Sequence, residues 1–173
     1  MRMLFLCWIL AIANAASAST PYEMKHVALL QPDFVLQERI AADALAAYIA
    51  ADALAAYIAS VNAAALDVLA GQTYEPAGGF LVLAVRPGRQ SAAWLDIRPA
   101  LPPGLARALV ARLRAVPAPT VEVGPVVFAV SASLSGGDPR VSSVPLPEAW
   151  AQAIREAGKP IATGDLVERI WPR

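Results

Sequence analysis

The sequence predicts an α+β protein in which a small antiparallel sheet of about three strands packs against one long helix and one shorter helix. Two observations lead to this class. Three short apolar runs are bounded by glycine and proline, as strands are. Two longer runs carry apolar residues at helical spacing. The expected strands are 80–85, 92–98 and 126–134, and the expected helices are about 33–70 and 103–116.

The expected long helix contains an internal repeat. The nonapeptide ADALAAYIA occurs at Ala42–Ala50 and again, without a mismatch, at Ala51–Ala59. A helix turns by about 100° per residue, so nine residues leave a net half turn. Each residue of the second copy should therefore point away from its twin. The expected apolar cluster of the first half is Phe34, Leu45, Tyr48 and Ile49, and that of the second half, on the reverse side, is Leu54, Tyr57, Val61 and Val68.

The repeat allows three interpretations. A recent tandem duplication would simply lengthen the helix. A break near Ala50–Ala53 would fold two half-helices onto one core. A projecting helix would offer its two faces to different partners. Removing one copy brings Phe34, Val61 and Val68 back into phase with the first copy, which favours the duplication.

Met1–Ala18 has the features of a cleaved secretory leader. Arg2 supplies the positive start, Leu4–Ile12 the apolar centre, and small residues lead to a cleavage site after Ala18. The apolar run is shorter than the roughly 20 residues that a membrane-spanning helix needs. We therefore expect a periplasmic or secreted protein, with an uncleaved anchor as the alternative.

The mature chain should form a single domain of 155 residues (173 minus 18), with 135–146 a loop and 147–173 a helical tail. The only cysteine, Cys7, lies in the leader, so no disulfide is available. Without Arg2 the chain holds 13 basic residues (14 minus 1) against 14 acidic ones. We expect no nucleic-acid partner, because no large basic field exists to hold nucleic acid or an anionic membrane surface. We also expect no membrane span in the mature chain.

Several shorter features refine this arrangement. The run from His26 to Leu30 is an edge strand or an extended lead-in to the long helix. Asp165 and Glu168 resemble a capping box. Trp150 and Trp171 should attach the tail to the domain.

The sequence offers little for catalysis. His26 is the only histidine, so a metal site built from several His or Cys side chains is impossible in the mature chain. No nucleophile-elbow, zinc-protease, phosphate-loop or dinucleotide motif is present. We predict no catalytic residue, no cofactor and no metal ligand. The expected partner surface comprises Trp94, Asp96, Arg98, Arg107 and Arg114, although a solvated face would explain the arginines and coverage by the long helix or the tail would explain Trp94.

The order strand, turn, strand, helix, strand over Phe80–Leu134, with prolines after the helix and Gly124 before the last strand, resembles the C-terminal domain of TonB-family energy transducers. The likeness covers about 55 of 173 residues and contains no unique motif. It implies a helix-covered antiparallel sheet, and a periplasmic or outer-membrane partner gripped by strand addition. The chain lacks the family's membrane anchor and its long Pro-rich spacer, so energy transduction is not implied.

Two functions remain open at this point. The first is a non-catalytic protein- or peptide-binding or assembly module that acts through a sheet edge or a helix face. The second is a small cell-envelope hydrolase that uses carboxylates. A flat surface with an unpaired strand edge would favour the binder. A deep pocket would favour the enzyme if it gathered two or more of Asp67, Glu75, Asp96 and Glu122.

Overall fold

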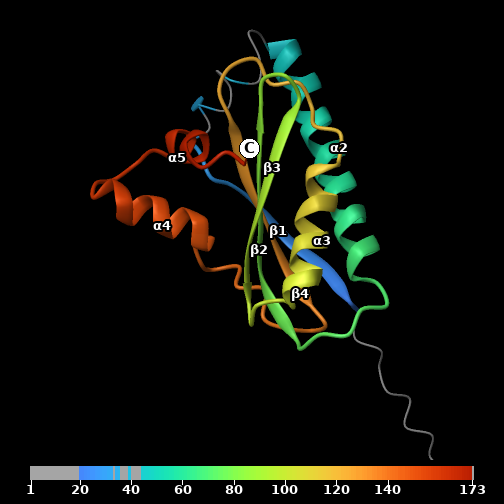
Figure 1. The fold of residues 1–173 in the computed structure, drawn as a ribbon. Helices are drawn as coiled ribbons and strands as arrows, with labels where there is room; N and C mark the ends of the chain where they lie inside the picture. The colour runs from blue at the N-terminus through green and yellow to red at the C-terminus, as the bar shows by residue number, and fades with distance from the viewer. Residues whose placement is uncertain (1–19, 33, 36–38, 40–43, 173) are drawn as a thin grey trace, which may run out of the picture.

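The computed structural model describes residues 20–32, 34–35, 39 and 44–172, with the backbone alone over 44–50. Expectations about the leader and about the side chains of the first repeat copy lie outside these residues. The ribbon is shown in Figure 1. Its elements, in chain order, are β1 (Tyr22–Leu29), α2 (Ala44–Leu69), β2 (Ala77–Arg86), β3 (Gln90–Arg98), α3 (Pro103–Arg114), β4 (Val126–Leu134), α4 (Glu148–Ala157) and α5 (Thr163–Arg169).

The sheet has four strands in the order β1-β4-β2-β3, and every neighbouring pair is antiparallel. The α+β class and all three predicted strands are confirmed. The fourth strand, β1, contains the run from His26 to Leu29, which is thus an edge strand. All nine residues of β4 are buried because helices cover both faces of the sheet. β1 and β3 form the two edges.

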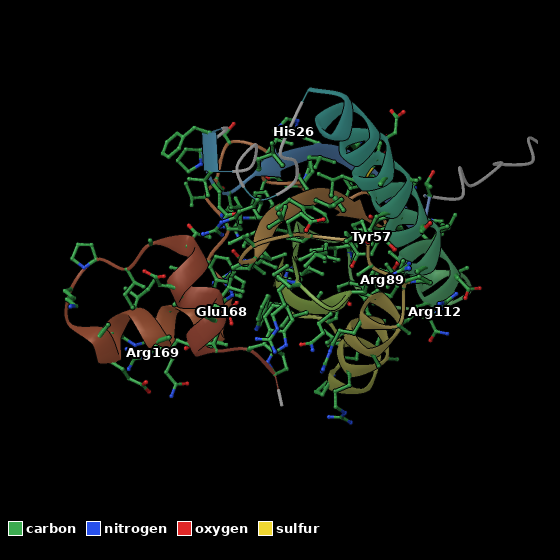
Figure 2. All side chains as sticks on the ribbon, turned by 90° about the horizontal axis from the view of Figure 1, so that it is seen from above. His26, Tyr57, Arg89, Arg112, Glu168 and Arg169 are labelled. Atoms are coloured by element: carbon green, nitrogen blue, oxygen red, sulfur yellow. The ribbon has the colours of Figure 1, made fainter. Side chains whose placement is uncertain are left out.

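Helices α2 and α3 lie on one face of the sheet, and α4 and α5 lie on the other, as both views show (Figures 1 and 2). Alternation along the strands supplies both cores, because successive side chains of a strand point to opposite faces. In β3, Leu95 and Ile97 contact the α2–α3 core, whereas Trp94 contacts the α4–α5 core.

Helix α2 carries the apolar stripe predicted for its second half. Tyr57, Val61 and Leu69 are buried, and Leu54 and Val68 are partly buried against the same core. The helix runs without interruption through residues 50–53, so the interpretation that places a break there is wrong. Its 26 residues span about 39 Å. One described segment, Ala51–Leu69, is long and apolar enough to cross a membrane by length and composition, and in this structure its stripe packs on the sheet.

The expected start of this helix at residue 33 lies outside the described residues, and the described part of α2 begins at Ala44. Residues between β1 and α2 are bound to the start of β4. The Gln31 side chain donates to the Pro125 carbonyl at 3.1 Å and accepts from the Val127 amide at 3.0 Å. The Arg39 guanidinium also donates to the Pro125 carbonyl.

The C-terminal tail packs on the sheet through its tryptophans, as predicted. Trp150 is 4% exposed. The Arg86 guanidinium lies over the Trp171 ring, with Arg86 Cζ 4.0 Å from the ring centroid. The expected capping box is wrong, because no side chain caps α5 and Glu168 instead forms an ion pair with Arg86 at 2.9 Å.

Candidate functional site at the β3 edge

A groove of about 580 Å³ runs along the outer edge of β3. Its volume falls in the range of roughly 300–1,000 Å³ that ligand sites occupy. Three elements line it: the middle of β3 forms the floor, α3 forms one wall, and the start of α4 forms the other. The lining residues are Ala93, Trp94, Leu95, Ala106, Arg107, Val110, Ala111, Arg114, Pro147, Glu148 and Ala149.

The floor of the groove is an unpaired strand edge. β3 pairs only with β2, and no backbone hydrogen bond links residues 90–98 to any other described residue. Every second residue of an edge strand directs its N–H and C=O away from its neighbour. Ala93 and Trp94 are 4% and 9% exposed, and Leu95 is partly exposed, so the two walls cover much of this edge.

The α3 wall is formed by a helix that buries one face and exposes another. Leu109 and Leu113 are fully buried against the sheet, which fixes the rotation of the helix. Arg107 and Arg114 are exposed and lie on the groove side, with small side chains between them. At the end of the helix, the Ser91 hydroxyl donates to the Arg114 carbonyl at 3.0 Å, which ties α3 to β3.

The α4 wall is held in place by a buried carboxylate on β3. Asp96 is 6% exposed, and its carboxylate accepts from the Leu146 amide at 2.9 Å. Arg98 and Arg140 each approach the same carboxylate at 3.5 Å. Because Leu146 immediately precedes Pro147, Asp96 sets where α4 begins.

Close contacts with the sheet also hold the loop 135–146, which leads to α4. A Cβ atom at Gly78 of β2 would lie 1.7 Å from the Asp138 carbonyl oxygen, so only glycine fits there. The Ser131 hydroxyl also donates to the Pro139 carbonyl at 2.6 Å. The loop that leads to the groove is thus pressed onto the sheet.

The structure brings together three of the five residues of the expected partner surface. Trp94, Arg107 and Arg114 line the groove. Trp94 is 9% exposed and is covered by Trp150 of the tail. Asp96 is internal, and Arg98 is exposed but is not among the lining residues.

The carboxylates proposed for an enzyme are dispersed in the described part of the chain. Glu75 lines a separate cavity of about 540 Å³ beside Pro99–Pro103. Asp67 faces Arg112 at 3.6 Å on the helix surface, and the Glu122 amide donates to the Arg39 carbonyl. Among the described residues, Glu148 is the only carboxylate that lines the groove. Among the described residues, no three His, Cys, Asp or Glu side chains cluster as metal ligands would.

Sequence reasoning missed the wall formed by Pro147, Glu148 and Ala149 and the small residues Ala106 and Ala111. Proline followed by glutamate is an ordinary helix start, and alanine is an ordinary helix residue. Nothing local relates Pro147 to Trp94, 53 positions earlier in the chain (147 minus 94). Only the return of the chain across the sheet does so.

No protein-family model, no curated protein and no solved structure matches this chain.

Proposed function

We propose that this protein is a non-catalytic binding module that receives an extended peptide segment of a partner protein as an added strand beside β3. The observation that carries the proposal is the unpaired β3 edge at the floor of a preformed groove. An added strand would lie about 4.8 Å from β3 and hydrogen-bond to its outward N–H and C=O groups.

The opposite sheet edge is less suited to this task. β1 carries a bulge between Met24 and His26, and exposed Glu23 and Lys25 form an ion pair beside it. Bulges and charged side chains are devices that discourage strand pairing at an edge. Residues 93–95 of β3 have neither feature, so the two edges differ in their capacity to accept a strand.

The partner class follows the expected location. If the leader directs the chain to the periplasm, the added strand would come from a periplasmic or outer-membrane protein. The resemblance to TonB-type C-terminal domains supports the same mode of binding. A carboxylate-dependent hydrolase finds no support in the groove, because Glu148 is the only acid among its described lining residues and is paired with Arg155 at 3.0 Å.

Selection of short random peptides on the mature protein, followed by hydrogen exchange with a selected peptide, tests the proposal. We expect the bound peptide to slow amide exchange in residues 92–96 and to leave β1 unchanged. Protection of β1 with no effect on β3, or failure to select any peptide, would contradict the proposal.

A pair of matched variants locates the binding site. Ala111 lines the groove, whereas Ala108 is exposed on the same helix away from it. Ala111→Trp should fill the groove and weaken peptide binding at least about tenfold, a loss of about 1.4 kcal/mol. Ala108→Trp should bind like the unmodified protein. Equal binding by both variants would place the peptide elsewhere.

A further inference from the structure

The α3 wall has a repeating pattern of charge and apolar surface. Arg107, Val110, Ala111 and Arg114 are three, four and seven positions apart, which places them on one side of the helix. Neither arginine forms an ion pair with another described residue. The wall therefore offers two free cations on either side of a small apolar patch.

The spacing of this pattern can be compared with an extended peptide. Seven residues of helix separate Arg107 from Arg114 by about 10.5 Å along the axis. Side chains on one face of a strand recur every two residues, at about 6.8 Å, and therefore at about 13.6 Å over four residues. Residues one and five of the peptide can reach the two arginines, because arginine side chains are long and flexible, while residue three lies over Val110 and Ala111.

We propose that the groove selects segments of the pattern acid–x–apolar–x–acid, a specificity that rests on the proposed strand addition. The two acids bind Arg107 and Arg114, and the apolar residue fills the patch between them. Positions two and four face the opposite wall, where Trp94, Pro147 and Glu148 lie.

The two arginines fix the register of the segment. A slip of one residue transfers every side chain to the other face of the strand. The two acids would then lose both arginines and would face a wall on which Glu148 is already paired with Arg155 at 3.0 Å. The loss of both arginines disfavours the slipped register, and uncharged residues are expected at positions two and four.

Fluorescence anisotropy with labelled synthetic peptides tests this specificity. A peptide with the core Glu-Ser-Val-Ser-Glu should bind about fivefold more tightly than one with Gln-Ser-Val-Ser-Gln, as two exposed ion pairs allow. The advantage should disappear near 1 M salt, where the screening length is about 3 Å. A peptide with the core Ser-Glu-Val-Glu-Ser, which moves the acids to the other face, should bind no better than the Gln peptide.

Variants of α3 assign the effect to the two arginines. Arg107→Gln with Arg114→Gln should remove the preference for the acidic peptide. Arg112→Gln is the matched control, because Arg112 lies on the same helix but pairs with Asp67. Arg107→Glu with Arg114→Glu should reverse the preference toward a Lys-Ser-Val-Ser-Lys peptide, which a merely structural role of the arginines would not do.

The outcomes separate this inference from the proposed function. Equal binding of the Glu and Gln peptides to the unmodified protein would overturn the charge pattern while strand addition stands. Retention of the acidic preference by the double Gln variant would also overturn it. Failure of these peptides and of every library-selected peptide to bind would overturn strand addition, and the inference with it.

Discussion

Trp94 of β3 and Trp150 of α4 meet edge to face, with ring centroids 5.7 Å apart and an interplanar angle of 72°. Such pairs contribute about 0.5–1.5 kcal/mol beyond the area they bury. The contact joins the floor of the groove to the helix whose first turn forms a wall. The tail is thus part of the groove's architecture.

Loss of the Trp150 ring should therefore destabilise the fold and open the groove. Trp150 is 4% exposed, and Trp150→Ala should cost about 3–5 kcal/mol in the free energy of unfolding. Ile154 lies on the same helix and is 38% exposed, so Ile154→Ala is the matched control and should cost less than about 1 kcal/mol. Urea unfolding measures both. Similar costs for the two variants would show that α4 does not pack as described.

Two leucines of α2 test its rotation. Leu69 is fully buried and Leu66 is 41% exposed. Leu69→Ala should cost about 2–5 kcal/mol, because it leaves a cavity between α2 and the sheet. Leu66→Ala should change the stability by about 0.5 kcal/mol or less. The reverse order in chemical unfolding would mean that the apolar stripe of α2 has been assigned to the wrong face.

Deletion of Ala51–Ala59 should leave the protein folded. The two copies are identical, so the deletion still places ADALAAYIA directly before Ser60, including a tyrosine at the position that Tyr57 occupies. The melting temperature, followed by circular dichroism, should be unchanged or higher. A control deletion of equal length, Ser60–Val68, removes the buried Val61 and should unfold the protein. Collapse of the first variant would show that the added helix length is required.

Two tyrosines should respond differently to loss of the hydroxyl. The Tyr22 hydroxyl is buried with no hydrogen-bond partner among the described residues, whereas Tyr74 donates to the Pro21 carbonyl at 2.5 Å. At pH 7, Tyr22→Phe should leave the unfolding free energy nearly unchanged, and Tyr74→Phe should lower it by about 0.5–1.5 kcal/mol. Equal losses in urea unfolding would contradict this assignment.

Burial of Tyr22 also predicts how the stability of the fold changes at alkaline pH. Burial raises the pKa of Tyr22 above its ordinary value of about 10. A raised pKa in the folded state means that the stability is complete below pH 10 and is lost as the pH rises toward the folded-state pKa. Tyr22→Phe should therefore lose less stability than the unmodified protein between pH 9 and pH 12. Equal losses of stability in the two proteins over this pH range would contradict the prediction.

Much of the fold could be predicted from local pattern. β4 was expected at its observed bounds because it is an alternating run between breakers, and α3 was expected to within two residues of its end. The binding of the Gln31 and Arg39 side chains to the start of β4 was not predicted, because no local rule identifies such a partner.

The candidate site was predictable only in part. Trp94, Arg107 and Arg114 were predicted as part of a partner surface, and all three line the groove. Their convergence with Pro147 depends on Asp96, which holds the Leu146 amide 50 positions away (146 minus 96). A single sequence does not specify which buried carboxylate meets which amide.

Residue periodicity and composition were enough to predict the α+β class, the two faces of β3 and β4, and the absence of familiar catalytic motifs. The packing of distant elements was needed to show which strands form the edges, that Trp150 covers Trp94, and that the β3 edge lies in a groove between two walls. Periodicity fixes how a residue is oriented within its own element. Neighbours from distant parts of the chain are fixed only when the elements pack.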